Sequence, residues 1–278
     1  MGFSYNGTTS PAGGHAIATS PTAPTTPTAH SNIAISPCCN PKLALAAALE
    51  AYSAIGFHRF EAFTSWAASA LDYHQPAEDY LQLAQRWGMT FSSMHLPAVG
   101  QDIAAGVAEA VAATRFAAQL GATIVLFKAV SRPAYIEAAP AYLDAIQGLG
   151  VTPVLQNHAG TAITTLDDFR QVIDGVADPR MKTLLEVGHF HKVGVSWRQG
   201  YHLLGDSVAL VHIKDMIGGQ SVPFGAGEVD LPGLFEHLTA AGYRGQYVVE
   251  MEVKDGENTL KYLADAKRYL GSIAGAML

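Results

Sequence analysis

Side chains suited to metal binding and proton transfer follow an apolar run in the stretch LLEVGHFHKVG, residues 184–194. The run ends in Glu186, and His189 and His191 come directly after it. A carboxylate beside imidazoles can form a metal site, an acid/base pair, or a polar loop that caps a strand. The choice depends on which other polar side chains the fold brings next to Glu186.

Polar residues also stand at the ends of the other apolar runs. Three pairs have a spacing of two positions, so the members of each pair share one face of a strand. These pairs are Gln156 with His158, His212 with Lys214, and Glu250 with Glu252. Three further residues at such ends are Glu61, His95 and Lys128. Charged groups enclosed in an apolar interior need partners or a metal, because burying a lone charge is costly.

Short β-rich runs alternate with segments of helical periodicity from Ile33 onward. Helical spacing of apolar residues is clearest in residues 41–57 and 104–122. Glycine closes several helices before the next strand, at Gly121, Gly150 and Gly242. The predicted strands are residues 32–36, 58–63, 89–96, 123–128, 152–158, 181–187, 208–214 and 246–253.

This alternation predicts a parallel sheet, because each strand is followed by a helix that returns the chain to the same edge. About eight such units match a closed (β/α)₈ TIM barrel. An open doubly wound sheet is the competing fold. It is disfavoured because SPCCNPK, residues 36–42, replaces the Gly-rich dinucleotide fingerprint after the first strand. We expect one catalytic domain over residues 32–278, preceded by a Pro/Thr/Ser-rich, loosely ordered extension over residues 1–31.

In a TIM barrel, functional side chains gather at the carboxyl ends of the strands. Four polar residues come from successive strands and could converge on one point: Gln156, Glu186, His212 and Glu250. Two carboxylates, one amide oxygen and one imidazole form an oxygen-rich ligand set. Such a set favours Mn²⁺, Mg²⁺ or Co²⁺ over a structural zinc ion.

Several motifs in this order resemble the xylose isomerase-like family of sugar isomerase/epimerase TIM barrels. They are YSAIGFHRFEAF, VLQNHAGT, LLEVGH, LVHIKD, PFGAGEVDLPGLFEHL and YVVEMEV, and the resemblance extends from Ile33 to Leu270. It implies a divalent metal, Mn²⁺ first, with Mg²⁺, Co²⁺ or Zn²⁺ as alternatives. The implied ligands are Gln156, Glu186, His212 and Glu250. His189 matches the family's substrate-binding histidine.

The sequence departs from the family pattern at two ligand positions, with Gln156 in place of glutamate and Glu186 in place of aspartate. Glu186 keeps the charge and has a longer reach. Gln156 can bind a metal through its oxygen but cannot act as a general base. The family's epimerases use paired glutamates from the fifth and eighth strands, so that mechanism does not transfer directly. The remaining candidates for acid/base catalysis are His158, Lys214 and Glu250, with Glu252 as an alternative to Glu250.

The resemblance implies an enzyme that removes a proton next to a carbonyl of an unphosphorylated sugar, keto sugar or cyclitol. Isomerisation or epimerisation is the first expectation. A lyase of the same superfamily is the alternative, either an inosose dehydratase or a deglycosidase of 3-keto glycosides. A non-catalytic carbohydrate-binding barrel is the third. The residues expected to contact the substrate are Glu61, Trp66, His95, Lys128, His189 and Glu252.

Composition narrows the class of partner. The formal net charge is −7 and no basic run occurs, which disfavours nucleic acid and anionic membranes as partners. The only cysteines, Cys38 and Cys39, are adjacent and cannot staple a loop, so we expect a reducing, cytoplasmic location. No apolar run has the length of a membrane span. The family resemblance implies a dimer or tetramer, with a second small subunit in the case of a deglycosidase.

Overall fold

The computed structural model describes Gly2 and residues 32–275, apart from the side chains of residues 274 and 275. The predicted extension over residues 1–31 therefore lies outside the described residues, except for Gly2. Within the described part of the chain, no helix is both long enough and apolar enough to cross a membrane.

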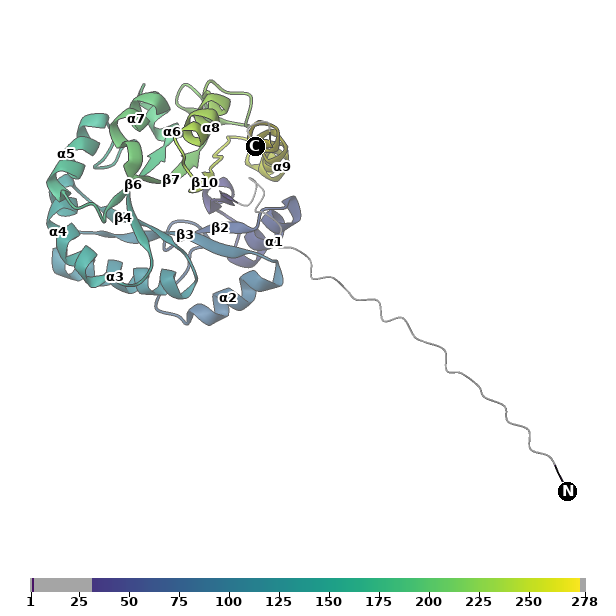
Figure 1. The fold of residues 1–278 in the computed structure, drawn as a ribbon, viewed down its shortest axis with the longest axis horizontal. Coiled ribbons are helices and arrows are strands. Elements are labelled where there is room, and N and C mark those ends of the chain that lie inside the picture. The colour runs from purple at the N-terminus through teal and green to yellow at the C-terminus, as the bar shows by residue number, and fades with distance from the viewer. Residues whose placement is uncertain (1, 3–31, 276–278) are drawn as a thin grey trace.

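The described residues form a closed barrel of parallel strands in the order β1-β10-β7-β6-β5-β4-β3-β2 (Figure 1). This confirms the predicted (β/α)₈ barrel. The barrel strands are β1 (Ile33–Ile35), β2 (Arg59–Phe63), β3 (Thr90–Val99), β4 (Ile124–Ala129), β5 (Thr152–Gln156), β6 (Lys182–Glu186), β7 (Val208–Ile213) and β10 (Gln246–Val249).

Helices surround the barrel in a ring, as Figure 1 shows. They are α1 (Leu45–Ile55), α2 (Ala77–Arg86), α3 (Ile103–Gln119), α4 (Arg132–Ala145), α5 (Leu166–Val176), α6 (Val187–Lys192), α7 (Trp197–Leu204), α8 (Leu231–Ala240) and α9 (Thr259–Gly275). Short 3₁₀ turns are η2 (Pro37–Cys39), η3 (Gly205–Ser207) and η4 (Gly256–Asn258). Gly121 and Gly242 adopt left-handed conformations directly after the C-cap residues of α3 and α8, as predicted.

The barrel interior is an apolar cluster made from alternate strand positions. It consists of Ala34, Ile124, Leu126, Val154, Leu184, Leu210 and Val248. Residues two positions apart on a strand face the same side. At the carboxyl ends of six strands, the next inward position, within the strand or directly after it, is polar: Ser36, Lys128, Gln156, Glu186, His212 and Glu250. An apolar barrel core thus ends in a polar layer, and this layer forms the base of the candidate site.

Two local elements differ from the expectation. The eighth barrel strand ends at Val249, so Glu250 and Glu252 follow the strand instead of belonging to it. A hairpin of β8 (Asp215–Ile217) and β9 (Gln220–Val222) follows β7. Asp215 stabilises this region because its carboxylate accepts backbone N–H groups from Met216, Gly225, Gly227 and Val229.

The segment after Glu186, for which a polar loop was one of the alternatives, is the short helix α6. The Glu186 carboxylate accepts the backbone N–H of Gly188 at 2.9 Å and so caps the helix that it precedes. This helix carries His189, and its buried Phe190 packs against α7. The orientation of His189 therefore depends on the packing between the two helices.

Replacing Gly200 of α7 with alanine is expected to separate these helices. A Cβ atom there would lie 2.6 Å from Cε2 of Phe190 and 2.9 Å from Cδ1 of Leu185. Overpacking of this kind costs about 1–3 kcal/mol of stability. Urea denaturation measures the loss, with Gly256→Ala as control because no heavy atom lies within 4 Å of that Cβ position. Equal stability of the two variants would contradict this account of the α6–α7 contact.

Candidate active site

His212 is the centre of a buried cluster at the carboxyl end of the barrel. Its Nδ1 lies 3.1 Å from Oε2 of Glu186 and 3.3 Å from Oε1 of Glu250. These three residues come from β6, from β7 and from the residue after β10, which are neighbours in the barrel. Their potential ligand atoms lie within 4.8 Å of one another, and all three side chains are buried. Three of the four predicted metal ligands therefore converge.

Glu61 supports His212 from the opposite side. Nε2 of His212 lies 3.1 Å from Oε1 of Glu61, and the Ser93 hydroxyl donates to the same oxygen at 2.9 Å. A carboxylate that accepts one imidazole N–H fixes the ring and leaves the other nitrogen for a metal. Glu61 is completely buried and is not among the residues that line the cavity. The structure thus places it behind the site, whereas the sequence predicts contact with the substrate.

The charges of the cluster fit a divalent cation. Burial, and after it the nearby Glu250 carboxylate, raise the pKa of Glu186 to about 7. Burial alone would lower the pKa of His212, but Glu61 and Glu250 raise it well above its usual value. Both raised pKa values mean that Glu186 and His212 hold protons more tightly beside the neighbouring carboxylates. A divalent ion among two carboxylates, an imidazole and the Gln156 amide would satisfy the same need.

Lys214 pairs with the outer carboxylates of the cluster. Its Nζ lies 3.1 Å from Oε2 of Glu250 and 2.6 Å from Oε2 of Glu252. Burial opposes the charge of Lys214, but the surrounding carboxylates raise its pKa well above the usual value. Burial would also favour protonated Glu250, yet Lys214 and His212 hold the pKa of this carboxyl well below its usual range. Glu250 is therefore an ionised carboxylate, and Lys214 is its counter-ion.

Gly188 makes room for the Lys214 side chain. A Cβ atom at this position of α6 would lie 2.8 Å from Cδ and 2.9 Å from Cβ of Lys214. These lysine atoms belong to the inner part of a side chain that is itself buried. The glycine is thus required for the path that Lys214 takes to Glu250.

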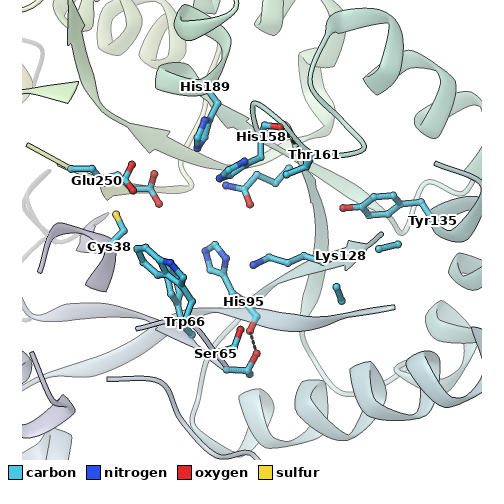
Figure 2. Close-up of a pocket in the computed structure, with 16 residues that line it drawn as sticks. Cys38, Ser65, Trp66, His95, Lys128, Tyr135, His158, Thr161, His189 and Glu250 are labelled. Carbon is cyan, nitrogen blue, oxygen red and sulfur yellow. Dashed lines mark hydrogen bonds between the residues drawn. The ribbon is translucent and has the colours of Figure 1, made fainter. Parts of the chain in front are cut away.

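A cavity of about 420 Å³ opens above the cluster. Figure 2 shows Glu250 on one side and Lys128 with Tyr135 on the other, with His158 and His189 along a third side. A volume of this size lies within the range of pockets that bind small molecules. The residues that line it include Cys38, Phe63, Trp66, His95, Lys128, Tyr135, Gln156, His158, Thr161, His189, Glu250 and Glu252.

His158 and His189 form a pair of imidazoles in close contact in this cavity, with their ring planes tilted by 37°. Their ring centroids are 3.7 Å apart. Burial lowers the pKa of both, to about 3 for His189, where Lys214 and His158 add to the effect. Both rings are therefore neutral near pH 7 and can donate and accept hydrogen bonds.

The free energy of unfolding is expected to fall as the pH drops below about 6.5, partly because of His189. Its pKa in the folded protein, about 3, lies below its ordinary value of 6.5, so the unfolded chain binds a proton that the folded chain excludes. His189→Gln should reduce this loss, as measured by urea denaturation at several pH values. His202→Gln, at an exposed position of α7, is the matched control. Identical pH profiles for the two variants would contradict the neutral state of His189.

Aromatic side chains form the wall opposite the histidine pair. The rings of Phe63 and Trp66 are 5.9 Å apart, and the Phe63 ring lies 4.1 Å from that of His95. Trp66 is 64% exposed and has a φ of 74°. Non-glycine residues rarely adopt this conformation, and such strain is often found at binding sites. Trp66 thus presents an open ring face at the mouth of the cavity.

The structure places the predicted site residues in two layers. The cavity is lined by Trp66, His95, Lys128, Gln156, His158, His189, Glu250 and Glu252. Beneath it lie Glu61, Glu186, His212 and Lys214. The strand-end pattern does not predict Tyr135 of α4 or Thr161 of the loop after β5. Neither follows an apolar run, so the sequence carries no signal for them.

The Gln156 amide makes no hydrogen bond to other residues in the described part of the chain. It is 7% exposed and lines the cavity beside the ligand cluster. A side chain of this polarity, almost buried and without a protein partner, is available to a metal or a substrate. Its assignment as a ligand remains a prediction.

Comparisons with known proteins agree with this architecture. Inosose dehydratase of Geobacillus thermodenitrificans is 27% identical over 150 residues, which are 45% of this chain and 49% of that protein. L-ribulose-5-phosphate 3-epimerase UlaE of Salmonella paratyphi B is 38% identical over 65 residues, or 23% of each chain. The chain therefore matches less than half the length of either relative.

A solved structure extends the similarity to the whole fold. The xylose isomerase-like TIM barrel protein of Mycobacterium smegmatis, in complex with magnesium, superimposes with a TM-score of 0.74 at 18% identity. The match covers 91% of this chain and all of the other. The family model described as "Xylose isomerase-like TIM barrel" matches residues 49–272. The chain therefore belongs to the xylose isomerase-like TIM barrel family.

Proposed function

We propose that the protein is a divalent-metal-dependent isomerase or epimerase of an unphosphorylated sugar, keto sugar or cyclitol. The reaction would begin with removal of the proton next to the substrate carbonyl. The observation that carries this proposal is the position of Glu250. Its carboxylate contacts His212 and Lys214 in the buried cluster and also lines the cavity.

Glu250 has the properties of the base for this step. It is ionised, and contacts with His212 and Lys214 fix its orientation. A base must reach the proton that it removes, and Glu250 is the one member of the converged cluster that the cavity reaches. A divalent ion held by Gln156, Glu186, His212 and Glu250 would polarise the carbonyl and stabilise the enediolate charge. Mn²⁺ is the proposed ion.

The remaining cavity residues would bind and orient the sugar. The neutral His158 and His189 can hydrogen-bond hydroxyl groups, and the exposed face of Trp66 can pack against the C–H groups of a ring. Lys214 keeps its proton and holds Glu250, so we assign it a positioning role. Glu61 has the same kind of role through His212.

The small number of cationic side chains in the cavity favours an unphosphorylated substrate. Among the described residues that line the cavity, Lys128 is the only lysine or arginine. A phosphate group is usually bound by several backbone N–H groups, or by arginine in a two-pronged hydrogen bond. The lining offers no arginine for such a bond.

A lyase is the second candidate, and Gln156 favours it. An amide in the fifth-strand position cannot exchange a proton with the second face of the substrate. Elimination shares the first step with epimerisation but needs only one base, together with an acid for the leaving group. The outcome then depends on whether the enolate regains a proton or expels a β-substituent. The similarity to both an epimerase and a dehydratase agrees with this shared first step.

Proton exchange in D₂O tests the proposal. Purified protein loaded with Mn²⁺ is incubated with free ketoses, inososes and methyl 3-keto-glucoside, and the products are followed by NMR. Deuterium in recovered sugar together with an isomer or epimer supports the proposed function. Deuterium with loss of water or methanol supports the lyase instead. Absence of both exchange and divalent-metal binding would contradict both candidates and leave a non-catalytic barrel.

A further inference from the structure

Lys128 occupies the inward position at the carboxyl end of β4, two residues after the interior residue Leu126. Figure 2 shows its side chain pointing into the cavity, on the side opposite Glu250. Within the described residues it has no ion pair or hydrogen bond. Its ammonium group makes a cation–π contact with the Phe63 ring, whose centroid lies 5.9 Å from Nζ. This ammonium group is therefore free to act on a molecule in the cavity.

The groups around Lys128 come from every neighbouring element. Glu61 lies on β2, His95 on β3 and Tyr135 on α4, while His158 and Glu250 follow β5 and β10. Burial lowers the pKa of Lys128, and the Glu61 and Glu250 carboxylates only partly oppose this effect. The resulting pKa is about 8. Proton transfer is most efficient when the pKa of the group is close to the working pH.

The other cavity residues are poorly suited to give up a proton. Gln156 has none to transfer, and burial keeps His158 and His189 neutral. Burial raises the pKa of Tyr135 to about 12, which holds its proton firmly. Lys214 lies beneath the cavity and is paired with two carboxylates. Lys128 is the cavity side chain that has no ion-pair partner among the described residues and can also release a proton near neutral pH.

We propose that Lys128 is the second acid/base of the reaction and transfers a proton on the substrate face opposite Glu250. This inference rests on the proposed function. The C–H proton passes to the Glu250 carboxylate, and the electrons of that bond enter the enediolate. The Lys128 ammonium then gives its proton to the same carbon from the other side, and the enediolate returns to a carbonyl. Glu250 ends protonated and Lys128 ends as an amine, and exchange with water restores both.

Two measurements on Lys128→Met distinguish proton removal by Glu250 from proton delivery by Lys128. The Mn²⁺-loaded variant is incubated in D₂O with the same ketoses, inososes and methyl 3-keto-glucoside. Glu250 should still remove the proton and return a deuteron to the same face, so exchange into recovered substrate persists. Formation of the epimer should fall by about 10²–10⁴-fold, the usual contribution of acid–base catalysis. The thermal unfolding temperature should stay close to that of the wild type, because no ion pair is lost.

Lys128→Arg distinguishes proton transfer from the binding of an anionic substituent. Arginine keeps the positive charge but does not release a proton at accessible pH. The variant should retain the wild-type KM and still show the loss of kcat. Recovery of kcat in Lys128→Arg, or full epimer formation in Lys128→Met, would overturn the assignment and leave the proposed function intact. A wild-type protein that exchanges no proton with any probe would overturn both.

The pH profile gives a further readout. Epimer formation by the wild type should decline as the pH rises through about 8, because the donor must be an ammonium group. The exchange catalysed by Glu250 should not decline in this range. A decline of both rates in parallel would contradict a separate role for Lys128.

Discussion

Glu250→Gln is expected to reduce proton exchange between substrate and solvent by about 10³-fold or more. General-base catalysis alone contributes about 10²–10⁴-fold, and this change also removes a charged ligand. The amide keeps the size of the side chain but cannot accept a proton. It also leaves Lys214 and His212 with one negative charge fewer between them. Deuterium incorporation followed by NMR measures the effect directly.

The matched control is Glu109→Gln. Glu109 lies on α3 at the outside of the barrel, where its carboxylate accepts a hydrogen bond from Tyr73. The same change of charge there should leave the exchange rate unaltered. Exchange by Glu250→Gln at the rate of this control would show that another group removes the proton, and the proposed mechanism would then be wrong.

Gln156→Glu is expected to tighten metal binding by about tenfold or more, because the number of charged ligands is a main determinant of divalent-ion affinity. The same change should destabilise the metal-free protein. A third carboxylate would join Glu186 and Glu250, where burial and the charge of Glu250 already raise the pKa of Glu186 to about 7. The rise in unfolding temperature on addition of Mn²⁺ should therefore exceed that of the wild type. Calorimetric titration gives the affinity.

Gln147→Glu is the control for added charge, since Gln147 is exposed beyond the end of α4. It should leave metal affinity and metal-free stability close to those of the wild type. If Gln156→Glu behaves in the same way, the side chain of residue 156 lies outside the coordination sphere. The ligand set would then be limited to Glu186, His212 and Glu250.

The barrel could be predicted because its signals are local. Each strand is a short apolar run, and each run is followed by helical periodicity, so β4 and α4 can be recognised without knowledge of the rest of the chain. The inward face also follows from spacing. Gln156 and Glu186 each stand two positions after an interior residue, and alternation in a strand requires that they face the same side.

Contacts between distant residues could not be predicted in the same way. Glu61 and His212 are 151 positions apart, and only the packing of β2 against β3 decides that Glu61 points beneath the cavity instead of into it. Nothing in the sequence around Asp215 indicates that its carboxylate would bind the backbone of the segment up to Val229. Tyr135 reaches the cavity from a helix, and strand spacing gives no information about helical side chains.

The close approach of Gly188 to Lys214 also constrains how this chain can change. A methyl group at position 188 would occupy space that the inner part of the Lys214 side chain fills, so a larger residue there is expected to displace the lysine. A shorter residue at position 214 would remove the obstacle but also the counter-ion of Glu250. The two positions are therefore expected to covary in descendants of this protein. A homologue with a larger residue at position 188 would therefore need a different cation beside Glu250.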